Sequence, residues 1–222
     1  MIYLSWAALY EGGSDNSYFE IMIPRLMEHI VALHGTITTV IPTTAALKLR
    51  RAPFREAAVE ACGSRDAFEL IFVHADTGGR GLDVTVDSRS RGFCEEMHNV
   101  CQWPHQRCIS ISPRHETEAW VLADRDAVLD ALGYRGSPES IGLPANARHA
   151  ERLTNPKAVI EGAVSHVRGR RKTVDIKPLF AAIAQRQSFE RLREARSFLD
   201  FENNLRSALF DVGCIRNFSG RR

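Results

Sequence analysis

Acidic side chains and one histidine stand directly after three apolar segments of the chain. Glu11 follows IYLSWAALY, His74 and Asp76 end FELIFVHAD, and Glu116 and Glu118 follow RCISIS. If these segments are parallel strands, their carboxyl ends share one sheet edge, where open α/β sheets bind ligands. Carboxylates gathered there repel one another unless a cation lies among them, and oxygen ligands favour Mg²⁺ or Mn²⁺ over zinc. The pattern predicts a divalent metal held by Glu11, Asp76 and Glu118.

Each of these residues also has a purely structural interpretation. Glu11 and Asp76 both precede short glycine-containing stretches, so either could be an ordinary turn residue. Glu116 and Glu118 could stabilise the positive end of the helix that follows them. His74 could be a hydrogen-bonded core residue. The metal hypothesis therefore depends on the coincidence of several strand ends and not on any single residue.

Alternating strand and helix signals predict how these residues are positioned. Helical periodicity runs from Phe19 to Ile30, with Ser14 placed to cap the helix and Gly35 to end it. The segment 45–63 is interpreted as helical in pieces, broken near Pro53, and further helices are expected at 93–102 and 116–133. Strands are expected at 2–10, 36–42, 68–76 and 107–112.

This alternation is typical of an α/β fold. We expect a mostly parallel four-stranded sheet with helices on both faces, followed by a helical C-terminal extension. The polar, Gly- and Pro-containing stretch 134–149 marks the boundary between an α/β domain (residues 1–147) and a basic helical extension packed on it (residues 148–222).

Composition limits the classes of protein to consider. The 222 residues are 44% hydrophobic and 25% charged, which is ordinary for a globular protein. No apolar run approaches the roughly 20 residues of a membrane helix, so no membrane is expected among the partners. Five cysteines without a dense framework favour a reducing compartment. We therefore predict a cytoplasmic protein.

The small overall charge of +2 hides an uneven distribution. Residues 1–147 carry 13 Lys and Arg against 19 Asp and Glu, a net charge of −6, whereas residues 148–222 carry a net charge of +8. An acidic part beside a basic part suits a cation site next to a surface for a polyanion. The alternative is a solvated basic helical surface. The clearest basic cluster consists of Arg168, Arg170, Arg171, Lys172 and Lys177, which could hold a phosphate backbone.

A second set of metal-ligand residue types lies between residues 94 and 108. Cys94, His98, Cys101, His105 and Cys108 recur every three or four residues. Structural zinc sites usually pair C-x₂₋₄-C arms across a loop, and that arrangement is missing here. A half-buried helix is the favoured interpretation of this segment.

Three stretches resemble the Toprim fold shared by topoisomerases, primases and nucleases of the OLD (overcoming lysogenization defect) class. They are YEGGSDNSYFEIMIPRL, FVHADTGG and PRHETEAWVLAD, and the resemblance covers roughly residues 1–133. The chain resembles more narrowly a Toprim-like family of bacterial proteins. Its members are often encoded beside ATPases in phage-defence or mobile islands.

The resemblance implies a site and a chemistry. In Toprim proteins a glutamate after strand one and an Asp-x-Asp after strand three gather Mg²⁺, which corresponds to Glu11 and to His74-Ala75-Asp76. His74 departs from this pattern, and since histidine is a poor Mg²⁺ ligand, Mn²⁺ becomes the alternative ion. The HETEAW stretch places Glu116 or Glu118 at the same edge.

The implied function is Mg- or Mn-dependent hydrolysis of a phosphodiester in DNA or RNA, as an effector of phage defence. In this hypothesis Glu11, His74, Asp76 and Glu116 are the catalytic residues, and nucleic acid and an ATPase are the expected partners. A catalytically inactive scaffold that binds nucleic acid or an ATPase is the alternative, and processing of a small phosphorylated molecule is a weaker one. The sequence leaves a homodimer open.

Overall fold

The main sheet has four parallel strands. The computed structural model describes residues 1–76, 90–169 and 175–216. Its strands are β2 (Trp6–Leu9), β4 (Leu47–Leu49), β5 (Leu70–His74) and β6 (Cys108–Ile111), in the spatial order β4-β2-β5-β6. All three neighbouring pairs are parallel. The predicted α/β class, with a four-stranded parallel sheet, is confirmed.

The edge strand β4 differs from the prediction. Segment 36–42 was expected to supply a strand of the main sheet, but it yields only β3 (Thr39–Val40), which pairs with β1 (Ile2–Tyr3) in a separate two-stranded sheet. The edge position is filled by β4, from a segment interpreted as helical. Leu47 and Leu49 alternate with the exposed Lys48, and pairing with β2 outweighs the helix-favouring composition.

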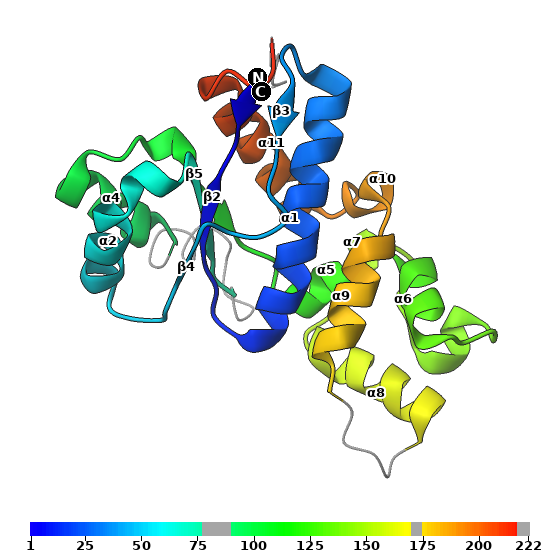
Figure 1. Cartoon of the computed structure of the whole chain (residues 1–222). Coiled ribbons are helices and arrows are strands. Elements are labelled where there is room, and N and C mark those ends of the chain that lie inside the picture. Colours follow the sequence, from blue (N-terminus) through cyan, green and yellow to red (C-terminus); the bar gives the residue numbers. More distant parts are fainter. Residues whose placement is uncertain (77–89, 170–174, 217–222) are drawn as a thin grey trace.

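Helices cover both faces of the sheet, as predicted (Figure 1). On one face, α1 (Gly13–His34) packs against side chains that include Trp6 and Phe72. On the other face, α2 (Phe54–Gly63) and α4 (Arg91–Cys101) pack against Ala7 and Ile71. Alternate residues of β2 and β5 thus serve opposite faces, as strand geometry requires.

The segment after β6 forms two helices and not one. A continuous helix over 116–133 was expected, whereas α5 (Thr117–Val121) ends in a turn before α6 (Arg125–Leu132). The side chain of Asp124 caps α6 by accepting a hydrogen bond from the amide of Ala127. Gly133 ends α6 with a φ of 66°, the left-handed conformation that favours glycine.

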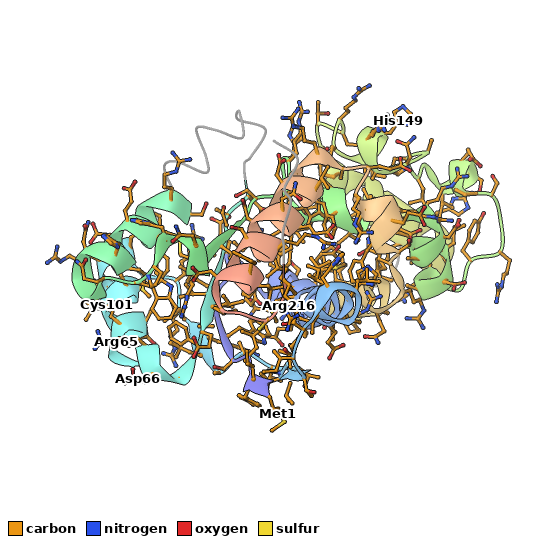
Figure 2. The ribbon with its side chains drawn as sticks, turned by 90° about the horizontal axis from the view of Figure 1, so that it is seen from above. Met1, Arg65, Asp66, Cys101, His149 and Arg216 are labelled. Carbon is orange, nitrogen blue, oxygen red and sulfur yellow. A yellow bond between two sulfur atoms is a disulfide. The ribbon has the colours of Figure 1, made fainter. Side chains whose placement is uncertain are left out.

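The C-terminal helices share one hydrophobic core with the sheet. That core extends from Leu4 to Ile215. The helices are α7 (Ala147–Ala150), α8 (Pro156–Arg168), α9 (Lys177–Arg186), α10 (Phe189–Leu192) and α11 (Arg196–Asp211). The short 3₁₀ helices are Arg65–Ala67, His105–Arg107 and Pro138–Ile141. Helix α9 contacts α1, and α11 contacts β6. In Figure 2, Cys101 of α4 and His149 of α7 lie on opposite sides of the molecule.

Four of the five cysteines form disulfides. Cys62 pairs with Cys101, Cys94 pairs with Cys108, and Cys214 is free and buried. The bonds connect α2 to α4 and α4 to β6, so these sulfurs are not available to zinc. The expectation that the cysteines lack a framework was wrong, and it no longer supports a reducing compartment. A cytoplasmic location stays a prediction.

No helix in the three described ranges is both long and apolar enough to cross a membrane.

Candidate functional site

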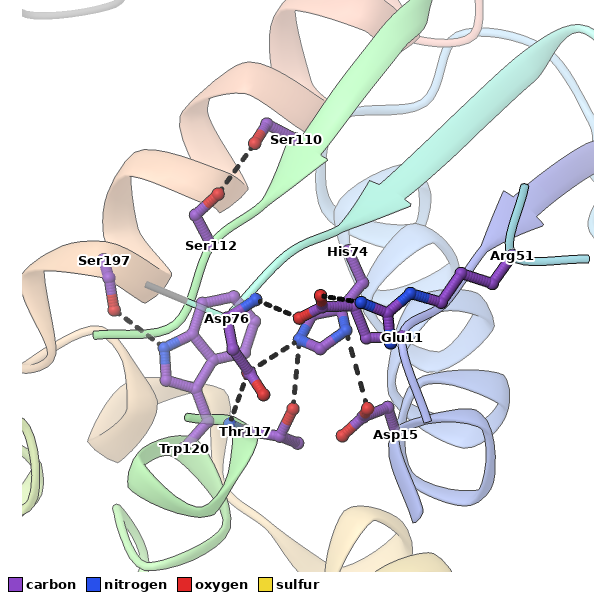
Figure 3. A network of polar contacts seen from close by, with 10 residues as sticks. All are labelled: Glu11, Asp15, Arg51, His74, Asp76, Ser110, Ser112, Thr117, Trp120 and Ser197. Carbon is purple, nitrogen blue, oxygen red and sulfur yellow. Dashed lines mark hydrogen bonds and ion pairs between the residues drawn. The ribbon is translucent and has the colours of Figure 1, made fainter. Parts of the chain in front are cut away.

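Two aspartates and a histidine come together at the carboxyl ends of β2 and β5. Asp15, His74 and Asp76 each offer one ligand atom, and these atoms all lie within 4.8 Å of one another. Nδ1 of His74 lies 3.7 Å from Oδ2 of Asp15, and Nε2 lies 3.1 Å from Oδ1 of Asp76 (Figure 3). Asp15 and His74 are buried, whereas Asp76 is partly exposed. One side of the cluster is therefore open to a ligand.

The glycines after β2 allow Asp15 to reach this position. The helix α1 begins at Gly13, and Ser14, which was expected to cap it, makes no side-chain cap. A Cβ at Gly12 would lie 2.9 Å from Oδ2 of Asp15, closer than real Cβ contacts allow. A Cβ at Gly13 would lie 3.3 Å from Nζ of Lys177. The Gly-Gly pair thus lets both a carboxylate and an ammonium approach the end of β2.

Thr117, the first residue of α5, contacts both His74 and Asp76. The amide of Thr117 donates a hydrogen bond of 3.1 Å to Oδ1 of Asp76. Its hydroxyl lies 3.1 Å from Nε2 of His74. Thr117 is fully buried, and its two contacts fix the positions of the His74 and Asp76 side chains.

Glu11 lies at the border of the cluster. Its Oε2 accepts a hydrogen bond of 3.0 Å from the amide of Asp76, and its Oε1 lies 3.7 Å from the guanidinium of Arg51 (Figure 3). Glu11 therefore holds the backbone of Asp76 in place from the end of β2. It is not part of the three-residue group whose ligand atoms lie within 4.8 Å.

The pKa values of Asp15, His74 and the neighbouring Glu118 are raised. Burial raises the pKa of Asp15, only partly offset by His74. Burial lowers the pKa of His74, but the hydrogen bond to Asp76 and the negative charges of Asp15, Asp76 and Glu11 outweigh it, and the net shift is upward. Burial, with Glu116 and Asp76 nearby, raises the pKa of Glu118 to about 7. A site with these properties favours positive charge, supplied either by protons or by a metal ion.

The donor set fits a divalent ion. A carboxylate can only accept, so the contact with Asp76 puts a hydrogen on Nε2 of His74. In the neutral ring Nδ1 then carries the lone pair, and it is buried without a hydrogen-bond partner among the described residues. An ion between Nδ1 and Asp15 would satisfy this atom, while the carboxylate on Nε2 orients the ring. A donor set that combines an imidazole nitrogen with carboxylate oxygen suits Mn²⁺ better than Mg²⁺.

The structure brings most of the sequence-predicted site residues to one edge. Glu11, His74 and Asp76 are in direct contact, and Glu118 is buried within electrostatic reach of them. Glu116 is the N-cap residue of α5, and its Oε2 is buried without a partner in the described part of the chain.

Asp15 was missed by the sequence reasoning. It belongs to the same EGGSD turn as Glu11, and its position in the first turn of α1 was the available signal.

The predicted basic cluster is only partly visible. Arg168 is exposed at the end of α8, and Lys177 begins α9 with its ammonium next to Gly13. Arg170, Arg171 and Lys172 lie outside the described residues. Of the two described members, Lys177 is the one that the fold brings to the acidic edge.

Comparisons of the chain with protein-family models, curated proteins and solved structures gave no match. The Toprim resemblance therefore depends on the residues themselves, with which the parallel sheet is consistent.

Proposed function

We propose that the protein is a divalent-metal-dependent phosphodiesterase that acts on nucleic acid, as a nuclease of Toprim type. The observation that carries the proposal is the grouping of Asp15, His74 and Asp76, with ligand atoms within 4.8 Å at the carboxyl edge of a parallel sheet. This is the edge at which α/β sheets bind ligands. The imidazole ligand makes Mn²⁺ the preferred ion.

The roles of the residues follow from their positions. Asp15 and His74 would hold the ion, which when bound supplies positive charge to a phosphate and lowers the pKa of a bound water, while Asp76 orients the His74 ring through Nε2. Burial raises the pKa of Glu118 to about 7 in the metal-free protein, and its carboxyl could give or accept a proton beside the ion. Glu11 positions Asp76 through its backbone amide.

Positive side chains beside the acidic edge support a polyanionic substrate. Lys177 has its Nζ next to Gly13, and Arg51 lies beside Glu11. Both could contact phosphates on either side of the ion without reading sequence. The role in phage defence and the ATPase partner are proposed on the resemblance alone.

Metal binding and cleavage test the proposal together. Asp15→Asn should lower Mn²⁺ affinity in calorimetry by more than the roughly 10- to 100-fold typical of lost supporting residues, and Asp76→Asn should lower it within that range. Both should abolish cleavage of plasmid DNA or tRNA. Asp66→Asn is the matched control, because the side chain of Asp66 is fully exposed. A parent protein that binds no Mn²⁺, or variants that cleave normally, would overturn the proposal.

A second candidate function is a scaffold that binds nucleic acid or an ATPase without catalysis. It is favoured by His74, whose protonated ring would place its own positive charge between Asp15 and Asp76 and replace the ion. In that case nucleic-acid or ATPase binding should survive both Asp→Asn substitutions and should not respond to Mn²⁺.

A further inference from the structure

A small pocket opens beside the metal cluster, with Glu11 and His74 among its lining residues. It has a volume of about 170 Å³ and lies at the ends of β2, β4 and β5. Its wall is mostly apolar, with Leu9, Val73, Ala52 and Phe54 among the lining residues. Glu11 belongs both to this pocket and to the border of the cluster, so a molecule bound at the ion lies next to the pocket.

The pocket has a rigid aromatic side chain and a cation at its rim. Phe54 begins α2 and packs against Gly92 of α4, where a Cβ would lie 3.2 Å from the ring. Because Gly92 has no side chain, the Phe54 ring can pack closely against α4. Arg51 lies shortly before Phe54 in the chain. Its side chain is 74% exposed, and its guanidinium is directed toward Glu11 (Figure 3). An apolar floor, one fixed ring and one exposed guanidinium suit a flat base attached to a phosphate.

We propose that this pocket receives one nucleobase of the substrate, next to the phosphate held at Asp15, His74 and Asp76. The volume is well below the roughly 300 Å³ of typical small-molecule pockets, so it has room for one base-sized group. Arg51 contacts the phosphate on the far side of that nucleotide. This inference rests on the proposed function and narrows its substrate class.

The consequence is a preference for single-stranded nucleic acid. A base inside a duplex is stacked and paired, and it can enter a pocket only after it is unstacked at a cost of a few kcal/mol. Single strands, frayed ends and loops avoid this cost. The pocket therefore selects unpaired nucleotides over intact duplex.

Two ligands that differ only by the base test the pocket without any cleavage. AMP and ribose 5-phosphate are titrated by calorimetry into the full-length protein with Mn²⁺. AMP should bind at least about tenfold more tightly, as expected for one base stacked on an aromatic side chain. Equal affinity for the two ligands, or no binding of either, overturns the inference.

Matched variants test whether the pocket causes the preference for AMP over ribose 5-phosphate. Ala52→Trp fills the pocket and Phe54→Leu removes the ring but keeps an apolar side chain, so both should bring the ratio of the two affinities close to one. Val59→Trp is the control, because Val59 lies on the exposed side of α2 and does not line the pocket. If Ala52→Trp disturbs folding, Phe54→Leu still decides the outcome. A ratio that stays high in Phe54→Leu contradicts the role of the ring.

Strand preference and cleavage separate this inference from the proposed function. A short single strand should bind at least about tenfold more tightly than the duplex of the same sequence, and equal binding contradicts the single-strand preference. If the protein prefers AMP over ribose 5-phosphate but cleaves no nucleic acid, the base pocket is supported and the phosphodiesterase function is contradicted. If it cleaves nucleic acid but shows no such preference, the phosphodiesterase function is supported and the base pocket is contradicted.

Discussion

Nε2 of His74 lies 3.1 Å from Oδ1 of Asp76, two residues further along the chain at the end of β5. This contact fixes the hydrogen on Nε2 and turns Nδ1 toward Asp15, 3.7 Å away. The space between Nδ1 and Asp15 can therefore be bridged by a proton or by a metal ion, but not by both. Competition between proton and metal governs the properties expected of this site.

Replacing the histidine should change the preferred ion. His74→Asp converts the donor set to carboxylates only, which Mg²⁺ favours, and it removes the nitrogen that favours Mn²⁺. The ratio of Mg²⁺ to Mn²⁺ affinity, measured by calorimetry, should rise by about tenfold or more. His149→Asp serves as the control because His149 is exposed on α7. An unchanged ratio in His74→Asp would show that His74 does not contact the ion.

Without metal, stability should fall as the pH rises from about 4.5 to above 7. The pKa values of Asp15, His74 and Glu118 are all raised in the folded protein, so these three groups bind more protons in the folded than in the unfolded state. The lowered pKa of His29 opposes them only below about 6.5. For Glu118, stability decreases between the usual pKa of 4.5 and the folded value of about 7, by about 3 kcal/mol. For His74, the decrease begins near 6.5 and continues upward.

Thermal melting in a chelator and in Mn²⁺ measures this dependence. Mn²⁺ binds the deprotonated ligands, so the stabilisation that it gives should grow with pH. Glu118→Gln should flatten the metal-free curve below pH 7, where Glu118 titrates. A melting temperature that rises with pH in the chelator would contradict the raised pKa values.

Glu118 should act on the reaction and not on the ion. Glu118→Gln keeps the shape of the buried side chain but cannot transfer a proton, so the cleavage rate should fall by about 100-fold or more. Mn²⁺ affinity should stay the same. Glu60→Gln, at an exposed position of α2, is the control. If Mn²⁺ affinity falls together with the rate, Glu118 is the metal ligand that the sequence predicted.

The elements that the sequence predicts well are those with a complete local signal. The buried strand before His74 and the periodic helix up to Gly35 appear where expected, whereas the apolar run 2–10 was expected as one strand and is divided into β1 and β2, which belong to different sheets. Strand β4 has only three residues, and its conformation comes from pairing with β2, which no local pattern of Leu47 to Leu49 reveals.

The sequence predicted the residues of the candidate site that topology alone brings together, but not Asp15. Parallel strands bring His74 and Glu11 to one edge by topology alone. The inward position of Asp15 depends on the two glycines that let its carboxylate approach, and this is a three-dimensional effect. Its charge was visible in the sequence, but a surface residue in the first turn of a helix has the same signature.

The disulfides give the last prediction. Protein purified without reductant and then unfolded should show one reactive thiol, that of Cys214, whereas fully reduced protein should show five. Cys62 and Cys101 are separated by 39 residues, and Cys94 and Cys108 by 14. By the chain-entropy account, losing either bond should lower the free energy of unfolding by about 3 to 4 kcal/mol.

Loss of the Cys62–Cys101 disulfide should affect the base pocket more than the ion cluster. Cys62–Cys101 joins the helix that begins with Phe54 to α4, whereas Asp15 and His74 come from α1 and β5. The paired substitution Cys62→Ser and Cys101→Ser should therefore reduce the preference for AMP over ribose 5-phosphate more than it reduces Mn²⁺ affinity. Cys214→Ala, which breaks no bond, is the control. Five reactive thiols in the protein as purified would contradict the two disulfides. A Mn²⁺ affinity that falls as far as the preference for AMP would contradict the division between the ion cluster and the base pocket.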